Sequence, residues 1–169
     1  DRFTMAILSR VNMKNAGTRY NKRGVNGDGY AANSVETELF FKNENTKRIY
    51  SFLQIRGSIP LYWTQVTNLA YNPPIVIDSE RAQAAFQKYI ENQLSRYKNM
   101  LFISLVNSKG AEKVLGDAFE AQSKNKERIK FVPFDLHKEC KGLKYENIDL
   151  VLWPQIEKDV REYAYDVRD

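Results

Sequence analysis

The hydrophobic pattern of this chain changes its period near Ser79, and this change constrains the fold more than any other feature. Before Ser79, short alternating or apolar runs separated by Gly, Asn and Pro are typical of strands. The predicted strands cover residues 4–11, 35–41, 49–55, 61–66 and 75–77. Asn43-Glu44-Asn45 separates the second strand from the third, so we expect these two strands to form a hairpin.

After Ser79 the apolar residues recur at helical spacing, and helices alternate with strands. Ser79 is expected to cap a helix that extends through Lys98. The later predicted elements are a buried strand at 100–106, a helix around 111–119, a strand at 129–134 and a helix over 148–163. Pro154 should kink the last helix or mark the first turn of a new one. The sequence predicts an α/β fold, a mixed β-sheet flanked by helices, with right-handed crossovers between parallel strands in its second half.

Composition excludes several classes of protein. With 169 residues, of which 43% are hydrophobic and 28% charged, the chain has the composition of one ordinary globular domain or part of one. A single cysteine and a single histidine exclude a disulfide scaffold and a zinc site built from several Cys and His residues. No apolar run approaches the roughly 18 residues of a membrane-spanning helix, so we expect no segment to span a bilayer.

The charge distribution permits an anionic partner without selecting one. Lys and Arg number 26 against 21 Asp and Glu, which gives a formal net charge of +5. The basic residues gather in the first thirty residues, in 124–130 and in 138–144. A nucleic-acid-binding domain is compatible with this charge, but the chain carries no recognisable RNA- or DNA-binding motif. We therefore expect no nucleic-acid partner.

Cys140 is the only cysteine, and its surroundings do not suit a nucleophile. Cysteine-based phosphatases use Cys-x5-Arg, in which the thiolate attacks phosphorus and the arginine holds the equatorial oxygens. The residue six positions after Cys140 is Glu146 rather than Arg, and the neighbouring Glu139 disfavours a thiolate. We expect Cys140 to be structural.

The glycine-rich segment 24–29 leaves two alternatives open. It lacks the strand and helix that flank a dinucleotide fingerprint, and it lacks the Gly-Lys-Ser/Thr of a Walker A loop. Its backbone amides, together with Arg19, Lys22 and Arg23, either bind phosphate or belong to a solvent-facing hairpin loop.

Two pairs of titratable residues also permit two interpretations each. Glu36 and Glu38 lie on one side of a predicted strand, where they either bind a metal or pair with nearby Arg and Lys, and we favour pairing. His137 and Glu139 suggest an acid–base pair, but no nucleophile is evident beside them. A role in positioning other groups near an active site suits His137 better.

Three segments together resemble the Sac family of phosphoinositide phosphatases. They are residues 16–38, with Arg19-Tyr20-Asn21-Lys22-Arg23-Gly24 and Val35-Glu36-Thr37-Glu38; residues 51–63, with Arg56-Gly57-Ser58-Ile59-Pro60; and residues 134–142, with His137-Lys138-Glu139-Cys140. Their order and spacing match as well, and the resemblance covers nearly the whole chain. The chain is more similar to the synaptojanin-like and Sac branches than to the vacuolar branch.

The resemblance implies that the full-length protein is a phosphoinositide phosphatase, a hydrolase that removes phosphate from phosphatidylinositol phosphates through a phosphocysteine and without a cofactor or metal. In the family the nucleophile lies in a Cys-x5-Arg motif, which this chain lacks and which we expect after Asp169. Residues 1–169 are thus expected to be the incomplete N-terminal part of a Sac catalytic subdomain, without a catalytic residue and inactive alone. The alternative is a non-catalytic Sac-like scaffold that binds lipids or proteins.

Substrate-binding residues follow from charge and from membership of the matching segments. A polyanionic inositol phosphate is held most naturally by charge-assisted hydrogen bonds from Arg and Lys. We expect these contacts from Arg19, Lys22, Arg23, Arg56, His137, Lys138 and Lys141. The expected partners are phosphatidylinositol phosphates, a membrane surface and protein adaptors, and the expected location is cytoplasmic, peripheral to cellular membranes.

Overall fold

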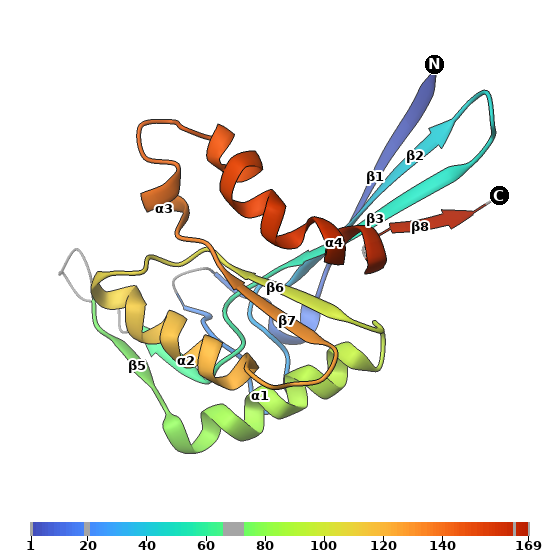
Figure 1. The fold of residues 1–169 in the computed structure, drawn as a ribbon. Helices are drawn as coiled ribbons and strands as arrows, with labels where there is room; N and C mark the ends of the chain where they lie inside the picture. Colours follow the sequence, from blue (N-terminus) through green and yellow to red (C-terminus); the bar gives the residue numbers. More distant parts are fainter. Residues whose placement is uncertain (1, 19–20, 66–72, 164, 169) are drawn as a thin grey trace.

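The computed structural model describes residues 2–18, 21–65, 73–163 and 165–168 (Figure 1). Its strands are β1 (Phe3–Val11), β2 (Val35–Asn43), β3 (Ile49–Arg56), β4 (Trp63–Gln65), β5 (Ile75–Ile77), β6 (Met100–Ser104), β7 (Ile129–Pro133) and β8 (Tyr165–Arg168). Its α-helices are α1 (Ser79–Leu94), α2 (Lys113–Ser123), α3 (Leu136–Glu139) and α4 (Trp153–Tyr163). Short 3-10 turns lie at Met13–Asn15 and Gly110–Glu112, and a π-helical turn lies at Ile148–Leu152. This order confirms the predicted α/β fold.

An antiparallel sheet with the strand order β1-β2-β3-β8 forms the first layer. The β2–β3 hairpin is confirmed, and Asn43 closes it because its Oδ1 accepts the backbone N–H of Asn45 at 2.9 Å. β8, which the sequence did not predict, pairs only with the Ile49–Phe52 half of β3. The Leu53–Arg56 half of β3 extends beyond β8.

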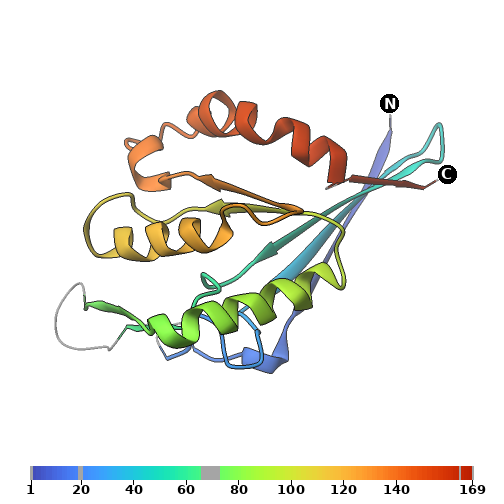
Figure 2. The same ribbon diagram turned by 60° about the horizontal axis from the view of Figure 1, so that its bottom comes forward.

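β6 and β7 form a separate parallel pair, in register from Met100 and Ile129 to Ser104 and Pro133. α2 connects them, as the predicted crossover requires. Figures 1 and 2 show α1 and α4 on opposite sides of this pair. Both kinds of pairing expected of a mixed sheet are therefore present, but in the described residues they belong to separate sheets.

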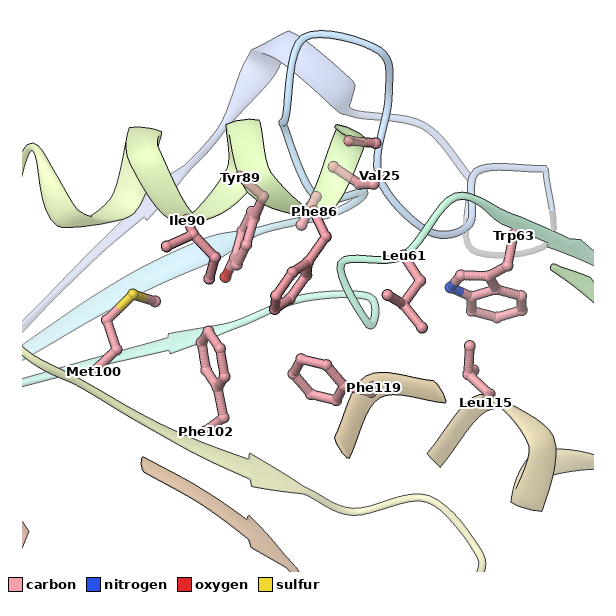
Figure 3. Close-up of a cluster of buried hydrophobic side chains, with 12 residues drawn as sticks. Val25, Leu61, Trp63, Phe86, Tyr89, Ile90, Met100, Phe102, Leu115 and Phe119 are labelled. Carbon is pink, nitrogen blue, oxygen red and sulfur yellow. The ribbon is translucent and has the colours of Figure 1, made fainter. Parts of the chain in front are cut away.

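The main core fills the space between α1, α2 and the strands (Figure 3). Phe86 of α1 and Leu61 are completely buried. The ring centroids of Phe86 and Phe119 lie 6.1 Å apart in an edge-on contact, and those of Phe102 and Phe119 lie 5.2 Å apart. Large aromatic side chains contribute most of the buried apolar area of such a core.

A second core lies under α4 and contains Cys140 together with Val132, Phe134, Leu152, Ile156 and Val160. Cys140 is buried and unpaired, in line with the expected structural role. Pro154 lies in the first turn of α4, directly after the π-helical turn. Of the two predicted outcomes, a kink or the first turn of a new helix, the structure shows the second.

The ends of α1 differ from the prediction. Asp78, not Ser79, caps the helix: its Oδ1 accepts the backbone N–H of Arg81 at 3.1 Å, and an Asp is as good a cap as a Ser. The helix ends at Leu94 rather than Lys98. The residues after it leave the helix, and the Tyr97 hydroxyl donates a hydrogen bond to Glu36 of β2. No helix in the described ranges has the length and apolarity needed to cross a membrane.

Candidate functional site

A pocket of about 450 Å³ lies where three strands end. Arg56 is the last residue of β3, Val106 follows β6, and His137 belongs to α3, which follows β7; all three line this pocket. Binding sites of α/β proteins lie outside the carboxyl ends of strands, because loops from separate strands converge there. This position makes the pocket the candidate functional site.

The charged lining of the pocket is mainly basic. Lys22, Arg23, Arg56 and His137 line it, and Glu112 is the one acidic side chain among its described lining residues. The Oε2 atom of Glu112 accepts the backbone N–H of Asn107 at 2.9 Å, which holds this carboxylate to the loop after β6. We call this pocket the basic pocket. Its excess of cationic groups favours an anionic ligand.

Hydrogen bonds between two loops explain why Arg23 and Arg56 line the same pocket although they are far apart in the sequence. The Gly24 N–H donates to Ser58 Oγ at 2.8 Å, and the Val25 N–H donates to the Leu61 carbonyl at 2.9 Å. Gly24 has a φ of +67°, and a Cβ there would collide with the Leu61 carbonyl oxygen. Only glycine suits this junction, which locks the Arg23 loop onto the segment after β3.

Arg23 differs from the other basic residues of the pocket in having a buried donor with no described partner. Its Nε is buried and has no hydrogen-bond partner among the described residues. Its guanidinium lies 5.6 Å from the ring centroid of Trp63, and the Trp63 Nε1–H donates to the Ile59 carbonyl at 3.0 Å, which fixes the indole (Figure 3 shows Trp63 at the edge of the core). Buried guanidinium donors are normally satisfied, so an anion in the basic pocket suits this group.

His137 is positioned by the short helix α3, whose cap is Asp135. Asp135 Oδ1 accepts the backbone N–H of Lys138 at 2.9 Å, while Oδ2 accepts the backbone N–H and the hydroxyl of Ser108, each at 2.7 Å. Desolvation opposes ionisation of Asp135, but the hydrogen bonds from Ser108 and Lys138 outweigh it and hold the pKa of the carboxyl below its usual value. Asp135 thereby ties the loop after β6 to the loop after β7.

The glycine-rich segment 24–29 is anchored to the main core, and most of its backbone amides have partners within the protein. Val25 and Ala31 form a bridge and are buried, so both ends of the loop belong to the main core. Inside the loop, Asn26 Oδ1 accepts the N–H groups of Asp28 and Tyr30, and the Asn26 carbonyl accepts that of Gly29. These amides are therefore already engaged, and phosphate binding by Lys22 and Arg23 beside the loop stays a prediction.

The other predicted substrate-binding residues lie elsewhere. Lys138 forms an ion pair with Glu139 at 2.6 Å, and this contact raises the pKa of Lys138. Lys141 is exposed, and neither lysine lines the basic pocket. Arg19 lies outside the described residues. The structure thus brings Lys22, Arg23, Arg56 and His137 together, and the binding role of all seven stays a prediction.

Glu36 and Glu38 pair with a cation on the neighbouring strand. Arg10 Nη1 lies 2.7 Å from Glu36 Oε1, and Arg10 Nη2 lies 3.3 Å from Glu38 Oε2. Glu36 also accepts the Tyr97 hydroxyl hydrogen bond. The favoured interpretation of these carboxylates, ion pairing within the sheet, agrees with this geometry.

Sequence reasoning missed several groups that shape the basic pocket. Trp63 is one of them: it is buried, lines the pocket and supports Arg23. Ser58 and Gln65 line the pocket as well; Ser58 stands in the Arg56-Gly57-Ser58 segment, which could have indicated it. No sequence pattern indicates Glu112 as a site residue, because it lies at the pocket only once α2 has packed against the rest of the fold.

Comparisons with known proteins place the chain in a family. Residues 1–141 match the family described as the SacI homology domain. The phosphatidylinositide phosphatase SAC2 is 41% identical over 152 residues in Danio rerio and 42% over 151 residues in Homo sapiens, and each match covers 87% of this chain. The phosphatidylinositol-3-phosphatase SAC1 of Saccharomyces cerevisiae is 34% identical over 154 residues, or 88% of this chain.

These relatives are much longer than the segment they share with this chain. The match spans 13% of each SAC2 protein and 25% of yeast SAC1. The family match nonetheless covers strands β1 to β7, the main core and the four basic residues of the pocket, from Lys22 to His137. The chain belongs to the SacI homology domain family.

Proposed function

We propose that this chain is part of a phosphoinositide phosphatase and that its basic pocket holds the phosphorylated inositol headgroup. The observation that carries the proposal is that Arg23, whose buried Nε has no partner among the described residues, lines the same pocket as Lys22 and Arg56. A phosphate group supplies the acceptor oxygens that such donors need. The names of the SAC1 and SAC2 relatives support phosphoinositides as the substrate class.

The residues of this chain bind and orient the substrate in this proposal, and they do not attack it. Cys140 is buried in the second core, and Glu146 stands where a Cys-x5-Arg motif would need its arginine. We propose that a Cys-x5-Arg segment outside residues 1–169 supplies the thiolate that forms the phosphocysteine. The arginine of that segment and the cations of the basic pocket would share the charge of the transferred phosphoryl group.

A cytoplasmic membrane surface is the proposed location of the substrate, because phosphatidylinositol phosphates are membrane lipids. Protein adaptors are further proposed partners. The cationic lining of the basic pocket supports an anionic surface rather than a neutral one.

Phosphate release by the full-length protein from short-chain phosphatidylinositol phosphates tests the proposal. Arg23→Ala should raise KM about tenfold or more, since it removes a charge-assisted hydrogen bond and leaves the headgroup without that partner. Lys141→Ala is the matched control, because it removes an exposed cation outside the basic pocket. Equal kinetics for both variants would contradict the assignment of the pocket. Headgroup binding without any phosphate release would favour the alternative, a non-catalytic Sac-like scaffold.

A further inference from the structure

The connection between α3 and the π-helical turn carries three consecutive exposed side chains. Leu143 and Tyr145 are 76% and 57% exposed, and Lys144 between them is exposed as well. We call residues 142–146 the α3 loop. Figure 1 shows this connection at the periphery of the molecule, on the side where β7 ends. His137, which lines the basic pocket, belongs to the helix directly before the loop.

The backbone of Leu143 is the unusual feature of this loop, because single exposed apolar residues are common. Leu143 has a φ of +64°. The other described residues with positive φ that are not glycine are all polar, namely Asn33, Lys47, Asn125 and Arg128. A left-handed backbone disfavours a bulky side chain, whereas Asn or Gly adopts it at lower cost. Leu143 thus carries backbone strain and gains no burial in return, which indicates a role other than folding.

Hydrogen bonds hold the α3 loop in this shape. The Tyr145 N–H donates to the Leu143 carbonyl at 2.8 Å, and the Asn147 N–H donates to the Lys144 carbonyl at 3.1 Å. The side-chain amide of Asn147 donates to the Glu139 carbonyl at 2.5 Å, which ties the loop back to the end of α3. The loop is therefore preorganised with its apolar side chains exposed, so a partner that covers them pays little ordering entropy.

The α3 loop combines the three kinds of side chain that proteins place at a lipid surface. Leucine enters the hydrocarbon boundary, tyrosine lies at the level of the headgroups, and lysine keeps its ammonium group beside the lipid phosphates. Glu146 is the one acidic residue of the loop, whereas the neighbouring basic pocket adds Lys22, Arg23 and Arg56. This excess of cations is complementary to anionic lipid, and a purely apolar protein partner would not need it.

We infer that the α3 loop docks on an anionic bilayer, with Leu143 and Tyr145 below the lipid headgroups and Lys144 beside their phosphates. Docking through this loop holds the basic pocket close to the lipid surface, because His137 in the adjoining helix lines that pocket. The choice of a bilayer as the partner rests on the proposed function. The membrane contact itself requires neither a phosphoinositide nor catalysis.

Flotation of the full-length protein with vesicles of phosphatidylcholine and phosphatidylserine, without phosphoinositide, tests the docking. Leu143→Asn should weaken binding about tenfold, because a leucine side chain no longer enters the bilayer. Asn tolerates the left-handed backbone, so this variant should keep or raise Tm. Met13→Asn is the matched control and should bind as the wild type does, because Met13 is 79% exposed but lies outside the α3 loop.

Three outcomes of this experiment are informative. If further polypeptide of the full-length protein covers the loop, Leu143→Asn should lower Tm and leave vesicle binding unchanged, which would overturn the inference. Equal weakening by Leu143→Asn and Met13→Asn would also overturn it, because the loop would then have no special place at the membrane. A protein without phosphatase activity that still loses vesicle binding through Leu143→Asn would contradict the proposed function and support the docking.

Lys144→Gln isolates the electrostatic part of the contact. It should weaken binding to vesicles that contain phosphatidylserine about fivefold and leave binding to pure phosphatidylcholine vesicles unchanged, because a lysine near the surface is attracted only by anionic lipid. Equal weakening on both kinds of vesicle would show that the variant acts through the structure of the loop rather than through its charge, and would contradict the assigned position of Lys144.

Discussion

At the scale of single residues, glycine conformation decides whether the basic pocket forms. Gly24 and Gly142 both have positive φ values, +67° and +73°. A Cβ at Gly24 would collide with the Leu61 carbonyl oxygen, whereas a Cβ at Gly142 would meet no atom within 4 Å. The two positions therefore share the backbone strain and differ only in the clash.

Gly24→Ala should destabilise the protein more than Gly142→Ala. The left-handed backbone alone costs a non-glycine residue about 1–2 kcal/mol, which is the expected loss for Gly142→Ala. Gly24→Ala should cost about 1–3 kcal/mol more, because the loop that carries Arg23 must move away from Leu61. Urea unfolding of both variants measures the difference. Equal losses would show that the Gly24 junction is not as tight as described.

Residue identity alone did not distinguish free cations from paired ones. Lys138 and Arg23 both belong to segments that resemble the Sac family, yet Lys138 pairs with Glu139 while the Nε of Arg23 has no described partner. The first contact is between sequence neighbours and could have been anticipated. The surroundings of Arg23 depend on Trp63, which contacts Arg23 only after the chain has folded.

At the scale of elements, the hydrophobic periodicity of the sequence correctly predicted those helices and strands that local interactions determine. The β2–β3 hairpin, β6, α2 and β7 were expected because their patterns span whole elements. α3 is too short to show a period and depends on the Asp135 cap, and β8 depends on pairing with β3 across the chain. Neither could be predicted from a local window.

The Asp135 cap should stabilise the protein in a pH-dependent way. Asp135→Ala should cost about 0.5–2 kcal/mol at neutral pH, the usual range for a helix cap. Because folding lowers the pKa of Asp135, its ionised form contributes stability above the usual value of 3.8, and this contribution is lost as the pH falls through the lower folded pKa. Chemical unfolding of the wild type and of Asp135→Ala, at several pH values from 7 to 3, measures the difference in their free energies of unfolding. A wild-type advantage that grows towards acid would contradict this account.

At the scale of the whole molecule, the described residues combine a formed pocket with an outer strand that leaves apolar side chains exposed. The outer strand β1 is exposed along its length, with Phe3, Met5 and Ile7 more than half exposed. Exposed apolar faces of this kind are more typical of interfaces than of free surface. In the described residues, the antiparallel and parallel pairings expected of one mixed sheet lie in separate sheets, and local sequence patterns could not show this because strand pairing depends on contacts across the chain.

The central claim is that the basic pocket, rather than the whole predicted set of cations, binds the phosphorylated headgroup. Calorimetric titration of a soluble inositol polyphosphate into the full-length protein tests it most directly, with Arg56→Ala compared with Lys138→Ala. We predict that Arg56→Ala weakens binding about tenfold or more, because the charge-assisted contact is lost, and that Lys138→Ala leaves the affinity unchanged. An equal loss in both variants, or no loss in Arg56→Ala, would contradict the account.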